Sequence, residues 1–325
     1  MLRKTLLLTL LIALMTACAP QATATTAPVA TTVPATEAPT IVPTSAPKDI
    51  HLTDGLGREI ILASPAQHVV SLAPSNTEIL FAVGAGSQVV GRDEFSDYPA
   101  EAKSVASVGG SMGQYSAEAI VALKPDLVLA AEINTPELVK QLEDLGLTVY
   151  YLKNPTTLEG MYANLGIVGQ LTGHDVTELV DSLKARVAAV DEKIAPLSSR
   201  PTVFYEIDAT DASKPYSYGP GTFGDLLIQR AGGVNLVTLA GIADSYPQVS
   251  LEQIVATNPT VIILGDSMWG VTIESVQARP GWEGIDALKN KNVFAFDDNL
   301  VSRPGPRLVD GLEQLAKLLH PDAFK

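Results

Sequence analysis

The sequence of 325 residues predicts an α/β fold: two doubly wound lobes with largely parallel sheets, joined by one long helical connector, with a ligand cleft between the lobes. Two observations predict this architecture. Residues 156–195 carry helical periodicity, and each side of them holds one copy of the same repeat. The repeat is Ser-x-Glu-x-Ile-Val-Ala-x-x-Pro, beginning at Ser116 and at Ser250, and each copy leads into a β-branched apolar run. We expect each copy to form a capped helix, ended by the proline, and then a buried parallel strand.

The connector is expected to consist of two consecutive helical pieces. The first opens with a Ser/Thr-x-x-Glu capping box from Thr156 to Glu159, and its apolar residues recur at spacings of three and four as far as Leu171. Gly173 can end this piece, and the second piece keeps one apolar stripe until Pro196 stops it. About twenty residues of helix at ~1.5 Å each span about 30 Å, which is the diameter of a small domain. The connector is therefore predicted to be a strut between the lobes.

Other strands and helices follow in order within each lobe. Strands are expected at 50–53, 58–62, 89–91, 127–130, 148–152, 202–207, 261–264 and 293–296, with another that begins at Val69. Helices are expected up to Phe81 and at 136–145, 223–231 and 307–319, besides the two repeat helices. Strands that alternate with helices predict parallel sheets, and such sheets bind ligands beyond the carboxyl ends of their strands.

Composition divides the chain into five parts. They are a lipoprotein signal peptide at 1–17, an acylated cysteine with a disordered Ala/Thr/Pro tether at 18–48, an N-terminal lobe at 49–155, the connector at 156–195 and a C-terminal lobe at 196–325. The first part has Arg3 and Lys4 ahead of an apolar core too short to span a membrane comfortably. Its end at Cys18 resembles a bacterial lipoprotein signal, with an ordinary signal peptide as the alternative. We therefore expect an extracytoplasmic protein, lipid-anchored to a bacterial membrane.

The charge of the chain limits its partners. The formal net charge is −14, and loss of Arg3 and Lys4 with the signal peptide takes it to about −16. So acidic a surface argues against nucleic acid and against anionic lipid as partners. Cys18 is the only cysteine, so no intrachain disulfide can form.

Catalytic and metal-binding alternatives find little support in the motifs. No Gly-x-Ser-x-Gly elbow occurs, and the glycine pairs do not fit a phosphate-cradling pattern. None of the four histidines follows a predicted strand at its carboxyl end, which argues against a catalytic triad, a clustered metal site and histidine-held haem. A tyrosinate ligand for haem from Tyr115, Tyr216 or Tyr218 stays open.

Several motifs together resemble one protein family. They are Val-Val-Ser-Leu-Ala-Pro-Ser-Asn-Thr-Glu at 69–78, Ser-Asp-Tyr-Pro at 96–99, the two repeats, Arg-Pro-Gly-Trp at 279–282 and Arg-Pro-Gly-Pro-Arg at 303–307. This family is the substrate-binding proteins of ABC importers for cobalamin, ferric siderophores and haem, and the similarity covers residues 49–321. The resemblance implies two α/β lobes on one long helix, only small opening and closing of the lobes, and no enzymatic activity.

Within that family the motifs look most like the cobalamin-binding branch, which holds a flat corrin between aromatic residues. By position, Phe95 matches an aromatic residue of that branch and Arg303 matches a cleft arginine. Met112 and Tyr115 lie near the position of one of its tryptophans, and Trp269 could supply another aromatic face. The candidate ligand-binding residues are Ser75, Asn76, Phe95, Tyr98, Met112, Tyr115, Glu132, Tyr216, Tyr218, Tyr246, Trp269 and Arg303.

The resemblance also implies the function and the partners. We expect a monomeric receptor, without a cofactor of its own, that captures a large metal chelate and delivers it to a dimeric ABC permease with its ATPase subunits. A cobalamin or other corrinoid is the preferred ligand, a ferric siderophore or haem is the alternative, and a doubly wound enzyme is a distant third reading. Glu118 and Glu252, one in each repeat, match the glutamates that dock onto permease arginines in this family. The alternative is that both only complement the dipole of the helix in whose first turn they lie.

Overall fold

The computed structural model describes residues 49–325, so the predicted signal peptide, Cys18 and the tether lie outside the described residues. The N-terminal lobe holds a sheet of order β5-β4-β3-β6-β7, and every pair of neighbours in it is parallel. Its strands are β3 (Val69–Ser71), β4 (Val89–Arg92), β5 (Ala106–Ser107), β6 (Leu127–Ala131) and β7 (Val149–Leu152), preceded by the hairpin of β1 (Ile50–Thr53) and β2 (Glu59–Leu62). The chain leaves β3 toward β4 on one side and returns to β6 on the other, as a doubly wound sheet requires.

The C-terminal lobe repeats this plan with fewer parallel strands. Its sheet has the order β10-β8-β11-β12, all parallel, and β9 pairs antiparallel with β8. Its strands are β8 (Thr202–Asp208), β9 (Tyr216–Ser217), β10 (Val234–Asn235), β11 (Val261–Leu264) and β12 (Val293–Ala295). The predicted fold of two lobes with largely parallel sheets is therefore confirmed; in the described part, the antiparallel strand pairs are β1 with β2 and β8 with β9.

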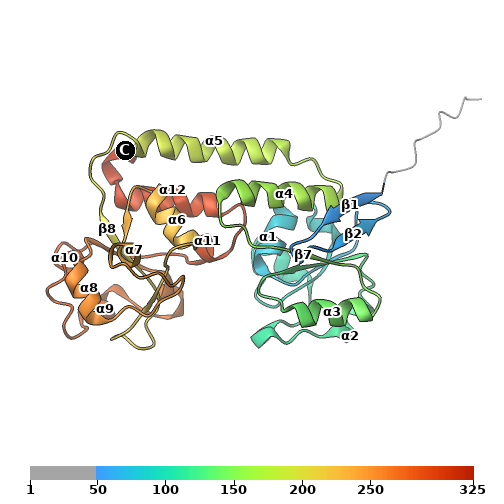
Figure 1. Cartoon of the computed structure of the whole chain (residues 1–325), viewed down its shortest axis with the longest axis horizontal. Helices are drawn as coiled ribbons and strands as arrows, with labels where there is room; N and C mark the ends of the chain where they lie inside the picture. Colours follow the sequence, from blue (N-terminus) through green and yellow to red (C-terminus); the bar gives the residue numbers. More distant parts are fainter. Residues whose placement is uncertain (1–48) are drawn as a thin grey trace, which may run out of the picture. The chain divides into compact units, whose positions relative to one another are not determined.

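Helices flank the sheets of both lobes. The N-terminal lobe has α1 (Pro74–Ala82), α2 (Ala117–Ala122) and α3 (Pro136–Asp144), with the 3₁₀ turns η1 (Gly86–Gln88), η2 (Ala100–Ser104) and η3 (Ser111–Gly113). The C-terminal lobe has α6 (Phe223–Arg230), α7 (Leu236–Leu239), α8 (Leu251–Thr257), α9 (Ile273–Gln277), α10 (Asp286–Lys289), α11 (Asn299–Ser302) and α12 (Leu308–Leu319), with η4 (Gly265–Trp269) and η5 (Pro321–Phe324). In Figure 1, α2 and α8 lie on the side of the two lobes away from α5 (Thr177–Ile194).

The two copies of the repeat adopt the same structure. Ser116 caps α2 and Ser250 caps α8, each by accepting a hydrogen bond from the backbone N–H three residues on. Each helix is followed by a left-handed residue, Lys124 at φ 49° and Asn258 at φ 48°, and then by the proline. The strands that follow, β6 and β11, are buried along their whole length. The internal repeat predicted from the sequence is thus a repeat of structure.

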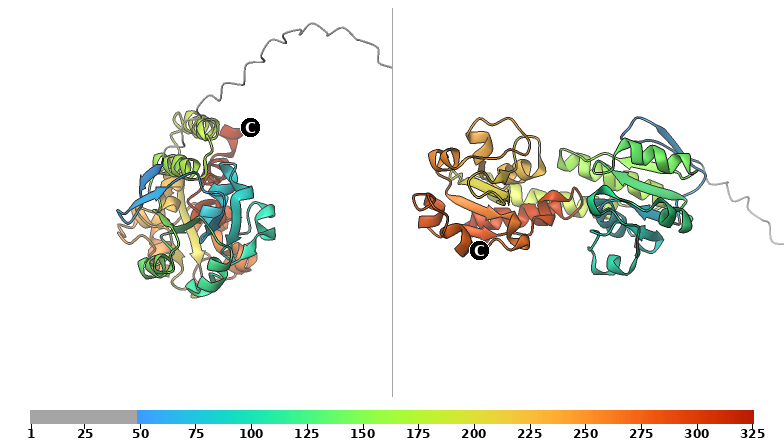
Figure 2. Two further views of the ribbon diagram at one scale, coloured as in Figure 1. Left: turned by 90° about the vertical axis from the view of Figure 1, so that its right-hand side faces the viewer. Right: turned by 90° about the horizontal axis from the view of Figure 1, so that it is seen from below.

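The connector doubles back instead of running straight. Helix α4 (Leu158–Thr172) lies over α1 of the N-terminal lobe, ends at Gly173 with φ 80°, and is followed by α5, which returns and packs on α12 of the C-terminal lobe (Figure 1). Helix α5, about 27 Å long at ~1.5 Å per residue, runs from one lobe to the other. The right panel of Figure 2 shows the two lobes side by side, with these helices between them.

The predicted capping box at the start of the connector was wrong by one residue. The cap of α4 is Thr157, whose hydroxyl accepts from Gly160 N at 3.0 Å, and Thr156 precedes the helix. The helix begins with the fully buried Leu158, and this burial sets the start of the helix. Glu159 then falls one position too early to complete a capping box, because Gly160 occupies the third position.

One apolar core runs continuously from one lobe to the other. Val69 of β3, Leu183 of α5 and Val203 of β8 belong to the same buried cluster. The neighbours Val70 and Phe204 face the opposite sides of their sheets, in two smaller clusters, one in each lobe. Because the large cluster includes the connector, bending the lobes apart would disturb buried contacts, which favours the small opening expected from a single-helix link.

Candidate functional site

Residues of both lobes line two adjoining cavities at the carboxyl ends of the strands. The first has a volume of about 560 Å³, and its walls include Ser75, Phe95 and Tyr115 from the N-terminal lobe and Trp269 from the C-terminal lobe. The second, of about 210 Å³, is lined by Glu132, Lys153, Tyr218 and Tyr246 among others. The two cavities share Asn154, Ser302 and Pro304. We call the two cavities together the interlobe cleft.

The cleft exposes large apolar side chains that a globular protein would ordinarily bury. Met112 is 96% exposed, Trp269 77%, Ile133 70% and Phe95 52%, and all four line the larger cavity. Met112 lies within η3 and has a left-handed backbone, with φ 48°, a conformation found disproportionately at functional sites. Apolar surface gathered in a concave site marks a place for a ligand with extended apolar faces.

Two of the three tyrosine hydroxyls of the cleft walls, those of Tyr115 and Tyr218, are bonded within the protein. Tyr115 donates to Leu72 O at 2.8 Å and accepts from Asn134 Nδ2 at 2.9 Å. Tyr218 donates to Asp298 Oδ1 at 2.9 Å, as does Tyr205 at 3.1 Å. Burial raises the pKa of Tyr115, and it raises the pKa values of Tyr205 and Tyr218 well above their ordinary range, with a further increase from the charge of Asp298. These phenols are thus neutral and brace the walls.

A buried carboxylate joins the lobes at the edge of the cleft. Glu78 of α1 is 2% exposed and accepts from Arg303 Nη1 at 2.9 Å and from Arg307 Nε and Nη2 at 2.8 and 2.6 Å. Both arginines belong to the segment between α11 and α12. Burial alone would lower the pKa of Arg307, but its bonds to Glu78 raise it above its ordinary value. Arg303 also donates to Asp97 at 2.8 Å, so its charge is matched by two carboxylates.

The predicted ligand-binding residues fall into two groups. Nine of them line the cleft: Ser75, Phe95, Met112, Tyr115, Glu132, Tyr218, Tyr246, Trp269 and Arg303. The other three lie elsewhere. Asn76 is buried and donates to Leu129 O at 3.1 Å, while Tyr216 is a half-exposed residue of β9. Tyr98 has its ring 4.0 Å from the guanidinium of Arg307 and lines a separate cavity of about 490 Å³ beneath α5.

Sequence reasoning missed several residues of the cleft. Asp93 is 2% exposed, and burial raises its pKa although it accepts hydrogen bonds from Ser96 and from Phe95 N. Ile133 follows β6 directly, and its apolar side chain in a polar loop was a signal that could have identified it. Ser302, the last residue of α11, and Pro304, in the motif that follows it, also line the cleft.

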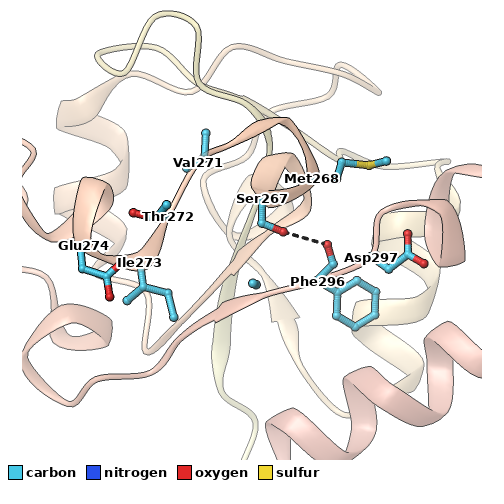
Figure 3. A pocket seen from close by; sticks show the side chains of 9 residues that line it. Ser267, Met268, Val271, Thr272, Ile273, Glu274, Phe296 and Asp297 are labelled. Carbon is cyan, nitrogen blue, oxygen red and sulfur yellow. Dashed lines mark hydrogen bonds between the residues drawn. The ribbon is translucent and has the colours of Figure 1, made fainter.

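A further hollow of about 600 Å³ belongs to the C-terminal lobe alone. Its lining comes from η4, α9 and the segment after β12, and includes Met268, Ile273 and Asp297 (Figure 3). Across it, the Ser267 hydroxyl donates to Phe296 O at 3.2 Å. Because the N-terminal lobe contributes nothing to its wall, this hollow is separate from the interlobe cleft.

The repeated glutamates occupy equivalent exposed positions. Glu118 and Glu252 are each the second residue of a serine-capped helix, and both are exposed. Hydrogen bonds to its own backbone N–H and to Ser250 lower the pKa of Glu252. Three residues on, Val121 and Val255 are 41% and 43% exposed, so the two helices present the same pair of side chains.

The described residues lack both a candidate metal-binding group and a candidate membrane-spanning helix. Within residues 49–325, no three His, Cys, Asp or Glu side chains come close enough to hold a metal ion. No helix in this range is both long and apolar enough to cross a membrane. Two α/β lobes on a helical backbone, with an apolar cleft at the strand ends, define the class of two-lobed ligand-binding proteins.

The chain belongs to the periplasmic binding protein family, which it matches over residues 69–300. It is 32% identical to the uncharacterized ABC transporter substrate-binding lipoprotein YvrC of Bacillus subtilis (strain 168), over 85% of this chain and 87% of that protein. It is 30% identical to a cobalamin-binding protein of Halobacterium salinarum, over 82% of this chain and 73% of that protein. Its structure resembles the apo haem-binding protein RhuT of Roseiflexus sp. RS-1, with a TM-score of 0.70 and 28% identity, over 80% and 99% of the two chains.

These comparisons settle the class of the protein. The resemblance found in the sequence, to the substrate-binding proteins of ABC importers, is confirmed, and so is the prediction that the chain is not an enzyme. The relatives are named for cobalamin and for haem, so the comparisons leave the ligand of this chain undecided between chelates of that kind.

Proposed function

We propose that this protein captures a corrinoid in the interlobe cleft and delivers it to an ABC permease and its ATPase subunits. The observation that carries the proposal concerns the described cleft residues: none of them is a histidine, and the hydroxyls of the two less exposed tyrosines are bonded within the protein. The hydroxyls of Tyr115 and Tyr218 are bonded internally. None of the four histidines lines the cleft. A ligand that brings its metal already fully coordinated suits such a cleft, and cobalamin does so through its corrin and its own axial base.

The charge of the cleft supports the same choice. Its cationic lining residues are Arg303 and Lys153, and Arg303 is paired with Glu78 and Asp97. Haem carries two propionates, and many ferric siderophore complexes are anionic, so their binding would favour unpaired guanidinium groups. Cobalamin is close to neutral and offers flat apolar faces ringed by amides. Trp269 and Phe95 supply apolar surface for those faces, from opposite lobes.

A haem or siderophore receptor is the second candidate. It is favoured by Met112, whose exposed thioether is a soft group of the kind that ligates haem iron in cytochromes. The similarity to a haem-binding structure supports the same alternative.

Calorimetric titration with cyanocobalamin, hemin and a ferric hydroxamate separates these candidates. We expect cyanocobalamin to bind with a stoichiometry of one and to be recovered unchanged. Tight binding of hemin, with a Soret band that changes in a Met112→Ala variant, together with no heat from cyanocobalamin, would replace the corrinoid proposal with the haem one.

Glu118 and Glu252 are proposed as the docking points for the permease. A single copy of the chain presents both, so it can act as a monomer. The chain also offers a matched control, because Glu137 of α3 and Glu274 of α9 are likewise exposed second residues of threonine-capped helices outside the repeat. Glu118→Ala with Glu252→Ala should abolish transport and leave ligand affinity intact, whereas Glu137→Ala with Glu274→Ala should transport normally. If both double variants transport equally well, Glu118 and Glu252 do not dock the permease and only complement the dipoles of their helices.

Cys18 is proposed as the lipid attachment site that keeps the protein outside the cytoplasm at a bacterial membrane. A relative named as a substrate-binding lipoprotein supports this placement. Cys18→Ser should move the protein from the membrane fraction to the soluble fraction of fractionated cells. Retention of the variant in the membrane fraction would contradict the anchor.

A further inference from the structure

Trp269 is the most exposed aromatic side chain of the cleft, and it is carried at the end of η4. Two residues fix this short 3₁₀ helix to the sheet behind it. Asp266 Oδ2 accepts from Ala209 N at 3.1 Å, which ties η4 to the end of β8. The Ser267 hydroxyl donates to Phe296 O at 3.2 Å, which ties η4 to the end of β12 (Figure 3). The position of Trp269 therefore depends on these two attachments.

Asp266 lies in surroundings that do not suit a charged carboxylate. It is 3% exposed, and its second oxygen, Oδ1, is buried without a hydrogen-bond partner among the described groups. Glu206 pairs with Leu264 in the register of β8 and β11, which brings its carboxylate beside that of Asp266. Arg279 forms a bidentate ion pair with Glu206, in which Nη1 and Nη2 lie 2.5 and 2.7 Å from the two carboxylate oxygens of Glu206.

The balance of charges around Asp266 and Glu206 favours one proton on this pair of carboxyl groups. The charged and titratable groups around η4 are Tyr205, Glu206 and Asp208 on β8, Glu274 of α9, Arg279 after α9, and Asp297 and Asp298 between β12 and α11. A single guanidinium cannot compensate two buried carboxylates, and like charges at close range disfavour ionisation of one of them. A proton on Oδ1 of Asp266, shared with Glu206, would supply the missing partner of that oxygen.

We propose that Asp266 is a positioning residue for Trp269, and that it holds η4 in place as a neutral acid which shares its proton with Glu206. Ionisation of Asp266 places two negative charges side by side and loosens the attachment of η4. Burial, followed by the charge of Glu206, raises the pKa of Asp266 to about 7. The position of Trp269, and with it the shape of the cleft, therefore changes around neutral pH.

The chain contains two tryptophans, Trp269 and Trp282, which makes a direct test possible. The full-length protein labelled with 5-fluorotryptophan should give two fluorine resonances, and Trp269→Phe assigns them. In the ligand-free protein, the Trp269 resonance should titrate with a midpoint near pH 7, the value that the carboxyl pair sets. A Trp269 resonance that stays constant between pH 5 and pH 9 would overturn the proposal.

Variants identify the group that titrates. Asp266→Asn mimics the neutral acid, because its carbonyl can accept from Ala209 N and its amide can donate to Glu206, so the Trp269 resonance should become independent of pH. Ser267→Ala is the matched control: it weakens the other attachment of η4 and should keep the titration. Glu206→Gln removes the neighbouring charge and should move the midpoint to lower pH. Persistence of an unchanged titration in Asp266→Asn or in Glu206→Gln would refute the assignment.

The consequence for ligand capture rests on the proposed function. The affinity for cyanocobalamin should fall several-fold between pH 6 and pH 8 in the unaltered protein, and it should stay constant in Asp266→Asn. The fluorine measurement needs no ligand, so it tests Asp266 even if the corrinoid proposal fails. A normal fluorine titration with pH-independent affinity would show that the movement of Trp269 does not control binding, and it would refute this last step.

Discussion

The two lobes share a repeat but differ where they face the ligand. In the N-terminal lobe, Tyr115 is held by uncharged partners, the Leu72 carbonyl and Asn134. In the C-terminal lobe, Tyr218 and Tyr205 are both held by the carboxylate of Asp298. The repeat helices α2 and α8, on the side of the lobes away from α5, kept the same cap and the same glutamate. The two lobes therefore have the same proposed docking residues, but the tyrosines of their cleft walls have different hydrogen-bond partners.

The largest expected effect on stability comes from Glu78, which links the two lobes. Glu78→Ala leaves Arg303 and Arg307 buried without the carboxylate that they share, so we expect a loss of about 3–5 kcal/mol in the free energy of unfolding. Asp97→Asn is the control, because Asp97 is half-exposed and a surface partner is worth about 0–1 kcal/mol. Urea denaturation measures both. Equal stability of the two variants would mean that Glu78 does not hold the lobes together.

The two tyrosine braces should differ in strength. Tyr218→Phe removes a hydrogen bond to a carboxylate, worth about 1.5–3 kcal/mol. Tyr115→Phe removes two bonds to neutral groups, but Asn134 Nδ2 still donates to Leu72 O at 3.1 Å, so the net loss should be about 1 kcal/mol. Thermal unfolding should therefore show a larger drop in Tm for Tyr218→Phe. A larger drop for Tyr115→Phe would reverse the comparison of the two lobes.

Substitution of an exposed aromatic residue of the cleft should lower the affinity for the ligand more than it lowers the stability of the fold. Trp269→Ala should weaken cyanocobalamin binding by about tenfold or more, since burial of a large aromatic face contributes more than 1 kcal/mol. Its effect on stability should stay within about 0.5 kcal/mol, because the side chain is exposed. Tyr216→Ala, at a predicted site residue that does not line the cleft, should bind normally. If Tyr216→Ala loses affinity and Trp269→Ala does not, the ligand lies elsewhere.

The last comparison concerns the dependence of the free energy of unfolding on pH that Asp266 introduces. Its pKa is raised from 3.8 to about 7 in the folded protein, so between these values the folded state binds a proton that the unfolded state does not. The stabilisation is complete below pH 3.8 and is lost as the pH rises through about 7. Denaturation midpoints at pH 5 and pH 8 should therefore differ more in the unaltered protein than in Asp266→Asn. An equal difference in both proteins would contradict the raised pKa.

Local patterns predicted the longer helices and strands, whereas the short strand β5 and the short helices α7, α9, α10 and α11 were missed. The repeats, their serine caps and the strands that follow them depend on neighbouring residues, so the sequence reveals them directly. The two-residue strands β9 and β10 were missed because pairing with β8 defines them, and their own residues do not. The connector was predicted as helix, but its reversal at Gly173 depends on packing against both lobes.

The cleft was only partly predictable. Trp269 was predicted because it follows a predicted strand, whereas Phe95 and Tyr246 were predicted from the resemblance to the cobalamin-binding branch. The shared role of Glu78 was missed, since its partners Arg303 and Arg307 lie 225 and 229 residues further along the chain. Likewise, no pattern shows that Asn76 is committed to Leu129 O inside the lobe.

The most direct test of the proposed function is the position of cobalt in a crystal of the protein with cyanocobalamin. Anomalous scattering at the cobalt edge should give one peak within the interlobe cleft, near Phe95 and Trp269, with no protein atom bound to the metal. A cobalt atom ligated by a side chain of the protein, or one bound outside the cleft, would contradict the account.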